Sequence, residues 1–107
     1  MFGGLFQRGK AGQLADATHL RALFDALSAL AVDPRNWRAE ATRGADRLFV
    51  VRFDGGGPEI DADICAVLSR HLNAVREAQR SPSGQAFSRV ILRATSGDLS
   101  FDRHDWA

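Results

Sequence analysis

Hydrophobic residues recur at three- and four-residue steps in two separate segments of the chain. The first stripe consists of Leu20, Leu23, Phe24, Leu27 and Leu30. With polar residues such as Arg21 and Asp25 between them, this period predicts an amphipathic helix from Leu14 to about Ala31. Asp33-Pro34 ends it, because the residue before a proline is disfavoured in helical conformation.

The second stripe begins after a glycine-rich break at residues 54–58. It consists of Ile64, Val67, Leu68, Leu72 and Val75. Asp61 is suited to cap this helix, and Asp63 adds negative charge near its positive end. The pattern therefore predicts a helix that runs to about Arg80 and stops at the Ser81–Gly84 turn.

Between and after these helices the period changes to two residues, which is typical of half-buried strands. Four strands are expected, at Arg35–Thr42, Arg47–Phe53, Phe87–Thr95 and a short final one at Leu99–Phe101. Turns at residues 43–46 and 96–98 join them into two hairpins.

The predicted order is helix, strand, strand, helix, strand, strand. Two amphipathic helices cannot bury their stripes alone, so we expect an α+β fold in which both pack on one face of a four-stranded antiparallel sheet. The four glycines within residues 1–13 predict a flexible N-terminal arm, and residues 14–107 form the single domain.

Length and composition restrict the class of protein further. A chain of 107 residues with 45% hydrophobic and 25% charged residues is expected to form one globular domain. Its apolar runs are too short to cross a bilayer, and Cys65 is its single cysteine. We therefore expect a cytoplasmic protein without membrane contact.

Candidate catalytic patterns are incomplete. Gly4–Ala11 resembles a phosphate-binding loop, but Ala11 replaces the required Ser or Thr and no strand precedes it. Cys65 and His71 are six residues apart on one predicted helix, which does not bring them together on one face. In a strand, His104 would lie on the face opposite to Asp105. We expect no enzyme activity, no cofactor and no metal site.

The exposed face of the predicted sheet is rich in arginine. Arg89 and Arg93, with Arg38 and Arg52, would form a basic surface suited to phosphate backbones. An RNA-binding sheet also needs stacking aromatics on that face, whereas Phe49, Phe53 and Phe87 fill the core more economically. Nucleic acid is therefore not the expected partner.

Acidic residues form two clusters in the sequence. The first contains Asp54, Glu59, Asp61 and Asp63; the second contains Asp98, Asp102 and Asp105, beside Trp106. Helix capping and solvated loops explain any single one of them. Together, an acidic rim with an exposed aromatic would steer a partner rich in Arg and Lys toward this protein.

The segment from Asp33 to Phe101 resembles the YezG-type immunity proteins. The resemblance is carried by Trp37 after Pro34, by the strand Phe49–Phe53, by the long second helix, by the Gly84-Gln85 loop and by the hairpin at Gly97-Asp98. The chain departs from the family in having no tyrosine and in carrying Phe87 where a tryptophan is usual.

The resemblance implies an antitoxin that binds and neutralises a cognate bacterial toxin domain, a basic, nuclease-like protein, without covalent change. The expected toxin-binding residues are Glu59, Asp61, Asp63, Asp98, Asp102 and Trp106. The alternative is a secretion-type chaperone or small protein-binding adaptor, which an exposed hydrophobic patch and a homodimer would favour. The oligomeric state is left open between monomer and homodimer.

Overall fold

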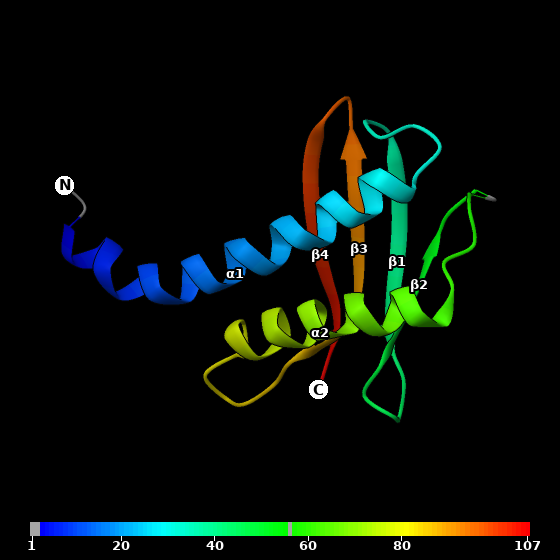
Figure 1. Cartoon of the computed structure of the whole chain (residues 1–107). Coiled ribbons are helices and arrows are strands. Elements are labelled where there is room, and N and C mark those ends of the chain that lie inside the picture. The colour runs from blue at the N-terminus through cyan, green and yellow to red at the C-terminus, as the bar shows by residue number, and fades with distance from the viewer. Residues whose placement is uncertain (1–2, 56) are drawn as a thin grey trace.

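The computed structural model describes the backbone of residues 3–55 and 57–107, and side chains from residue 17 onward. Its elements are α1 (Gly3–Leu30), β1 (Trp37–Arg43), β2 (Phe49–Phe53), α2 (Ala62–Ala78), β3 (Phe87–Thr95) and β4 (Asp98–Trp106) (Figure 1). This order confirms the predicted α-β-β-α-β-β arrangement.

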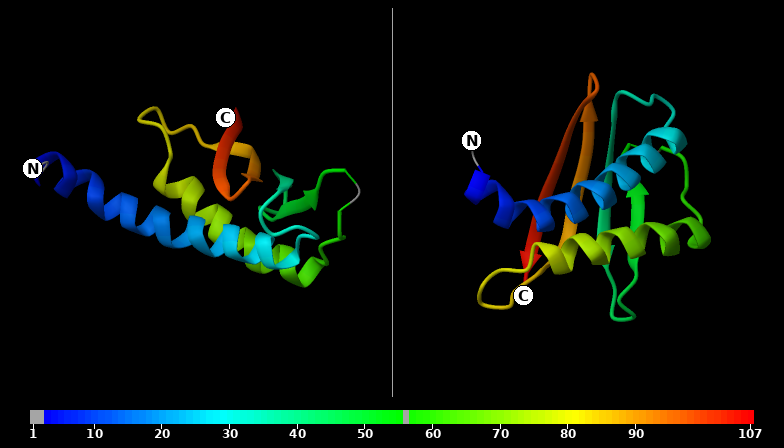
Figure 2. Two further views of the ribbon diagram at one scale, coloured as in Figure 1. Left: turned by 90° about the horizontal axis from the view of Figure 1, so that it is seen from above. Right: turned by 60° about the vertical axis from the view of Figure 1, so that its left-hand side comes forward.

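Both helices cover one face of a single antiparallel sheet, as predicted, and the other face is open (Figure 2). The strands are arranged in the order β2-β1-β3-β4, so each hairpin forms one half of the sheet and β1 pairs with β3 at its centre. Strands β2 and β4 are therefore the two edges. No helix within the described residues is both long and apolar enough to cross a membrane.

The core lies between the sheet and the two helices. Both predicted stripes contribute to it, since Leu23 and Leu27 of α1 and Leu72 and Val75 of α2 are at most 1% exposed. Fully burying one such side chain stabilises the fold by roughly 1.5–3 kcal/mol. Trp37 also packs there, and its Nε1 donates to Ser28 Oγ at 3.0 Å, which joins β1 to α1.

Helix α1 begins at Gly3 and not at Leu14 as the hydrophobic pattern predicts. The helix therefore includes most of the segment expected to form an irregular arm, while Met1 and Phe2 lie outside the described residues. Glycine lowers helix propensity, but extending an existing helix adds one hydrogen bond for each residue that is ordered. The Gly4–Ala11 segment forms early turns of this helix, and its side chains lie outside the described ones.

Strand β4 is also longer than the short final strand expected from the sequence. It pairs with β3 from Asp98 to Trp106, through a stretch whose charged residues conceal the strand pattern. The hairpin turns at Ser96 and Gly97, which have φ values of 51° and 86°. Two consecutive residues with positive φ are typical of a type I′ turn, whose twist matches that of the flanking strands.

Helix α2 covers the β2 edge of the sheet. Ser69, 1% exposed, lies beside the outward-facing backbone of Phe49. Its Oγ accepts the N–H of Phe49 at 2.7 Å and donates to the carbonyl oxygen of the same residue at 3.3 Å. Backbone groups that an edge strand would otherwise offer to another chain are thus satisfied within the protein.

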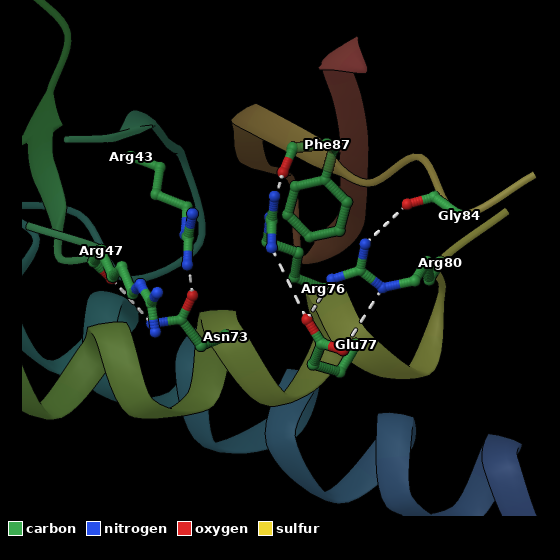
Figure 3. Close-up of polar contacts among 8 residues, drawn as sticks. All are labelled: Arg43, Arg47, Asn73, Arg76, Glu77, Arg80, Gly84 and Phe87. Carbon is green, nitrogen blue, oxygen red and sulfur yellow. Dashed lines mark hydrogen bonds and ion pairs between the residues drawn. The ribbon is translucent and has the colours of Figure 1, made fainter. Parts of the chain in front are cut away.

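The other end of α2 is attached to the sheet by arginine side chains (Figure 3). Arg76 Nε donates to the carbonyl oxygen of Phe87 at 2.8 Å, and Arg80 Nη1 donates to that of Gly84 at 2.6 Å. Burial, followed by repulsion from Arg43 and Arg80, lowers the pKa of Arg76. The cluster holds α2 against β3 and the loop before it.

Candidate interaction surface

The acidic residues expected to form one rim lie in two groups on opposite sides of the sheet. Glu59, Asp61 and Asp63 lie in the segment that joins β2 to α2, whereas Asp98 and Asp102 belong to β4. Since β2 and β4 are opposite edges, no continuous acidic rim connects the two groups. We call the first the α2 acidic group and the second, with Trp106, the β4 acidic group.

In the α2 acidic group, Asp61 has a structural role. It is the N-cap of α2, with φ −73° and ψ 168°, and its Oδ1 accepts the N–H of Ile64 at 2.9 Å. This confirms the predicted cap. Asp63 lies in the first turn, where its negative charge favours the positive end of the helix, and Glu59 is exposed just before it. Only Glu59 and Asp63 are therefore available for binding without loss of the cap.

In the β4 acidic group, the side chains lie along an exposed strand. Asp98 is exposed at the start of β4, and Asp102 Oδ2 lies 3.7 Å from Arg93 Nη2. Trp106 is 39% exposed, packs edge-on against Phe87 at 6.0 Å and has Arg103 5.5 Å from its ring centroid. Because Trp106 pairs with the buried Phe87, its ring lies on the helix side of β4, opposite to Asp98 and Asp102, and part of it stays exposed for a contact in a protein interface.

Asp105 departs from the expected strand alternation. It has a φ of 56°, a conformation that breaks the regular pleat, and its Oδ2 lies 3.0 Å from Nε of Arg89. Its carboxylate thus reaches the open face of the sheet, on which Arg89 and its cross-strand neighbour His104 lie. The prediction that His104 and Asp105 lie on opposite faces is wrong.

Three of the four arginines predicted for the open face, Arg38, Arg89 and Arg93, form ion pairs with carboxylates. Arg38 forms an ion pair with Asp54, Arg89 pairs with both Glu40 and Asp105 at 3.0 Å, and Arg93 pairs with Asp102. The hydrogen bonds to Glu40 and Asp105 raise the pKa of Arg89.

The aromatic side chains considered for base stacking lie on the other side of the sheet. Phe49 and Phe87 are at most 1% exposed, and Phe53 packs edge-on against Trp37, so these residues belong to the core as predicted. Partnered arginines without these aromatics are a poor surface for single-stranded nucleic acid.

The contact between His19 and His71 was not predicted from the sequence. His19 of α1 and His71 of α2 are 52 residues apart, yet their Nδ1 atoms lie 2.9 Å from each other. Burial, the charge of His19 and the charge of Arg70 lower the pKa of His71. Each histidine directly precedes a leucine, Leu20 or Leu72, of its helical stripe, which is the signal that both flank the same helix interface.

Cys65 is half-buried, with its Sγ 3.8 Å from the carbonyl oxygens of Val51 and Ile60. Among the side chains that the structure describes, from residue 17 onward, no three His, Cys, Asp or Glu residues are grouped to hold a metal ion.

Comparison with protein-family models, with curated proteins and with solved structures finds no match to this chain. The resemblance to the YezG-type immunity proteins therefore stays a hypothesis based on the residues that carry it.

Proposed function

We propose that the protein is an immunity protein that binds and neutralises a basic, nuclease-like toxin domain in the bacterial cytoplasm. The observation that carries the proposal is the β4 acidic group, in which Asp98, Asp102 and the half-exposed Trp106 lie on one accessible strand. Asp98 and Asp102 on the open face of this strand favour a partner rich in Arg and Lys, and Trp106, on the opposite face near the other end of the strand, adds an exposed aromatic contact. The resemblance of residues 33–101 to an immunity family points to the same function.

Inhibition requires binding alone. A folded surface that covers the basic active site of a nuclease excludes its nucleic-acid substrate, and opposite charges speed the encounter. Because charges at the edge of an interface mainly affect the association rate, complex formation should slow as salt rises.

The test is co-expression with the toxin domain encoded by the neighbouring gene. We expect the chain to restore growth of a bacterial host that expresses this domain, and calorimetry to detect a stable complex. Asp98→Lys with Asp102→Lys should slow association at least about tenfold, since both charges change from attraction to repulsion. Glu59→Lys with Asp63→Lys is the matched control at the other edge and leaves Asp61 to cap α2. Absence of both rescue and binding would contradict the proposal.

A secretion-type chaperone or adaptor is the second candidate. The observation that favours it is the exposure of Leu48 (45%), Val50 (58%) and Val67 (47%), apolar residues of the β2 and α2 side of the molecule. Leu48→Ser with Val50→Thr would weaken binding to an exported protein if this function is correct. The same pair should leave toxin neutralisation unchanged if the immunity function is correct.

A further inference from the structure

The two edges of the sheet differ in how they are covered. At the β2 edge, Ser69 of α2 satisfies the outward backbone groups of Phe49. At the β4 edge, both helices extend past the last strand (Figures 1 and 2). The helical layer is therefore wider than the sheet on that side, and the position beside β4 under the helices holds no strand of the described chain.

The hydrogen-bond pattern identifies the free groups of β4. Asp54 N–H donates to Arg38, so even-numbered residues of β1 face β2, while the bond from Gly97 to Arg35 places odd-numbered ones toward β3. Alternation across the antiparallel ladder then directs the backbone of Leu99, Phe101 and Arg103 to the outer edge. An edge of this kind is a template for one more strand.

The side chains on the two faces of β4 define what such a strand must carry. On the helix side, Leu99 is 55% exposed and borders a hollow of about 510 Å³ that Leu20 and Phe24 of α1 also line. On the open side lie Asp98 and Asp102, of which Asp102 has a long contact to Arg93, 3.7 Å between Oδ2 and Nη2. Paired residues of neighbouring strands project to the same face, so apolar residues would fill the hollow and basic residues would meet the aspartates.

We propose that β4 takes one added strand from the toxin partner, a segment in which apolar residues under α1 alternate with basic residues beside Asp98 and Asp102. This inference rests on the proposed function, of which it names the element that binds. A second copy of this chain is less suited, because its own helical layer would have to occupy the space that α1 and α2 already overhang.

The first test uses a probe in place of the toxin, a blocked nine-residue peptide of alternating lysine and valine, and the full chain. We expect it to bind and to slow amide hydrogen exchange at Leu99, Phe101 and Arg103, whose N–H groups face solvent in the free protein. A peptide with the same composition but grouped lysines, and one of alternating glutamate and valine, should bind at least about tenfold more weakly. Binding without protection of these three amides would overturn the proposal.

Backbone pairing has a separate signature. A strand directs the N–H groups of alternate residues to its neighbour. Two peptides, one N-methylated at every valine and one at every lysine, should therefore differ: one of them should lose binding and the other should keep it. The pair Asp98→Lys and Asp102→Lys should weaken binding at least about tenfold, while Glu59→Lys and Asp63→Lys should change it less than about twofold. Equal loss with the two N-methylated peptides, or with the two pairs of variants, would refute strand addition.

The last arm separates this inference from the proposed function. If the chain neutralises the toxin and the complex leaves the three β4 amides unprotected, strand addition is wrong and the immunity function stands. If the peptide adds to β4 and the chain fails to neutralise any toxin, the proposed function is wrong and with it the named partner. Dimers of the free chain with protected β4 amides would show that a second copy is the occupant, which also overturns the proposal.

Discussion

At the scale of single residues, the structure assigns Ser69 a role that its sequence position conceals. It follows Leu68, a residue of the hydrophobic stripe, and in the sequence it looks like a polar residue without a structural role. In the structure its hydroxyl group forms hydrogen bonds with both the N–H and the carbonyl oxygen of Phe49. A buried backbone group without a hydrogen-bond partner destabilises the fold, and here one side chain supplies the partner for two such groups, an N–H and a carbonyl oxygen.

Ser69→Ala should therefore destabilise the protein by about 1–3 kcal/mol, because the N–H and C=O of Phe49 lose their partner while they stay buried. Urea unfolding at neutral pH measures the change. Ser88→Ala is the control, since the Ser88 hydroxyl donates to the carbonyl oxygen of Asp105 at an exposed site. A loss no larger than that of Ser88→Ala would argue against the role given to Ser69.

At the scale of elements, one polar contact between α1 and α2 depends on protonation. A hydrogen bond between His19 Nδ1 and His71 Nδ1 needs one ring to donate and the other to accept, so protonation of both removes it. The pKa of His71 is lowered in the folded state, which means that the unfolded chain binds more protons below its ordinary value near 6.5. Stability then falls as the pH falls through this range.

The urea midpoint of the wild-type protein should thus decrease as the pH falls from 7.5 to 5.5. The urea midpoint of the His71→Gln variant should decrease less over the same range. His104→Gln serves as the control, because His104 lies on β4 and not in the contact between α1 and α2. Identical pH dependence in the wild-type protein and the His71 variant would rule out this contact as the sensor.

The length of the elements was predicted well only where side-chain pattern decides it. Strand β3 has the predicted bounds Phe87–Thr95, and α2 begins at its predicted cap. The start of α1 and the end of β4 were missed, because backbone hydrogen bonds continue through glycines and charged residues that carry no hydrophobic period.

At the scale of the whole molecule, the sequence predicts the layers but not the order of the strands. Period and turn residues are local, whereas the pairing of β1 with β3 joins segments about fifty residues apart. The single acidic rim was inferred without that order and therefore becomes two groups. The meeting of His19 and His71, and the reach of Asp105 to Arg89, likewise depend on tertiary contacts.

The charge pattern of the open face decides between a protein partner and RNA. Arg38, Arg89 and Arg93 each form an ion pair with a carboxylate of this protein, so RNA phosphates would have to displace that carboxylate. We expect wild-type affinity for a labelled oligouridylate to be no tighter than the nonspecific range, a Kd of roughly 10⁻⁴–10⁻⁶ M at physiological salt.

Glu40→Gln with Asp102→Asn should release Arg93 and leave Arg89 with Asp105 as its one carboxylate partner of the two, and should thereby strengthen binding at low salt, with a steeper loss as salt rises. The measurement is fluorescence anisotropy at several salt concentrations, with Glu59→Gln and Asp63→Asn as the control for the same change in net charge. If the wild-type protein binds the oligonucleotide tightly with a steep salt dependence, the open face is an RNA surface. If only the Glu40 and Asp102 variant binds it, the carboxylates on this face are what direct the protein away from nucleic acid and toward a basic protein.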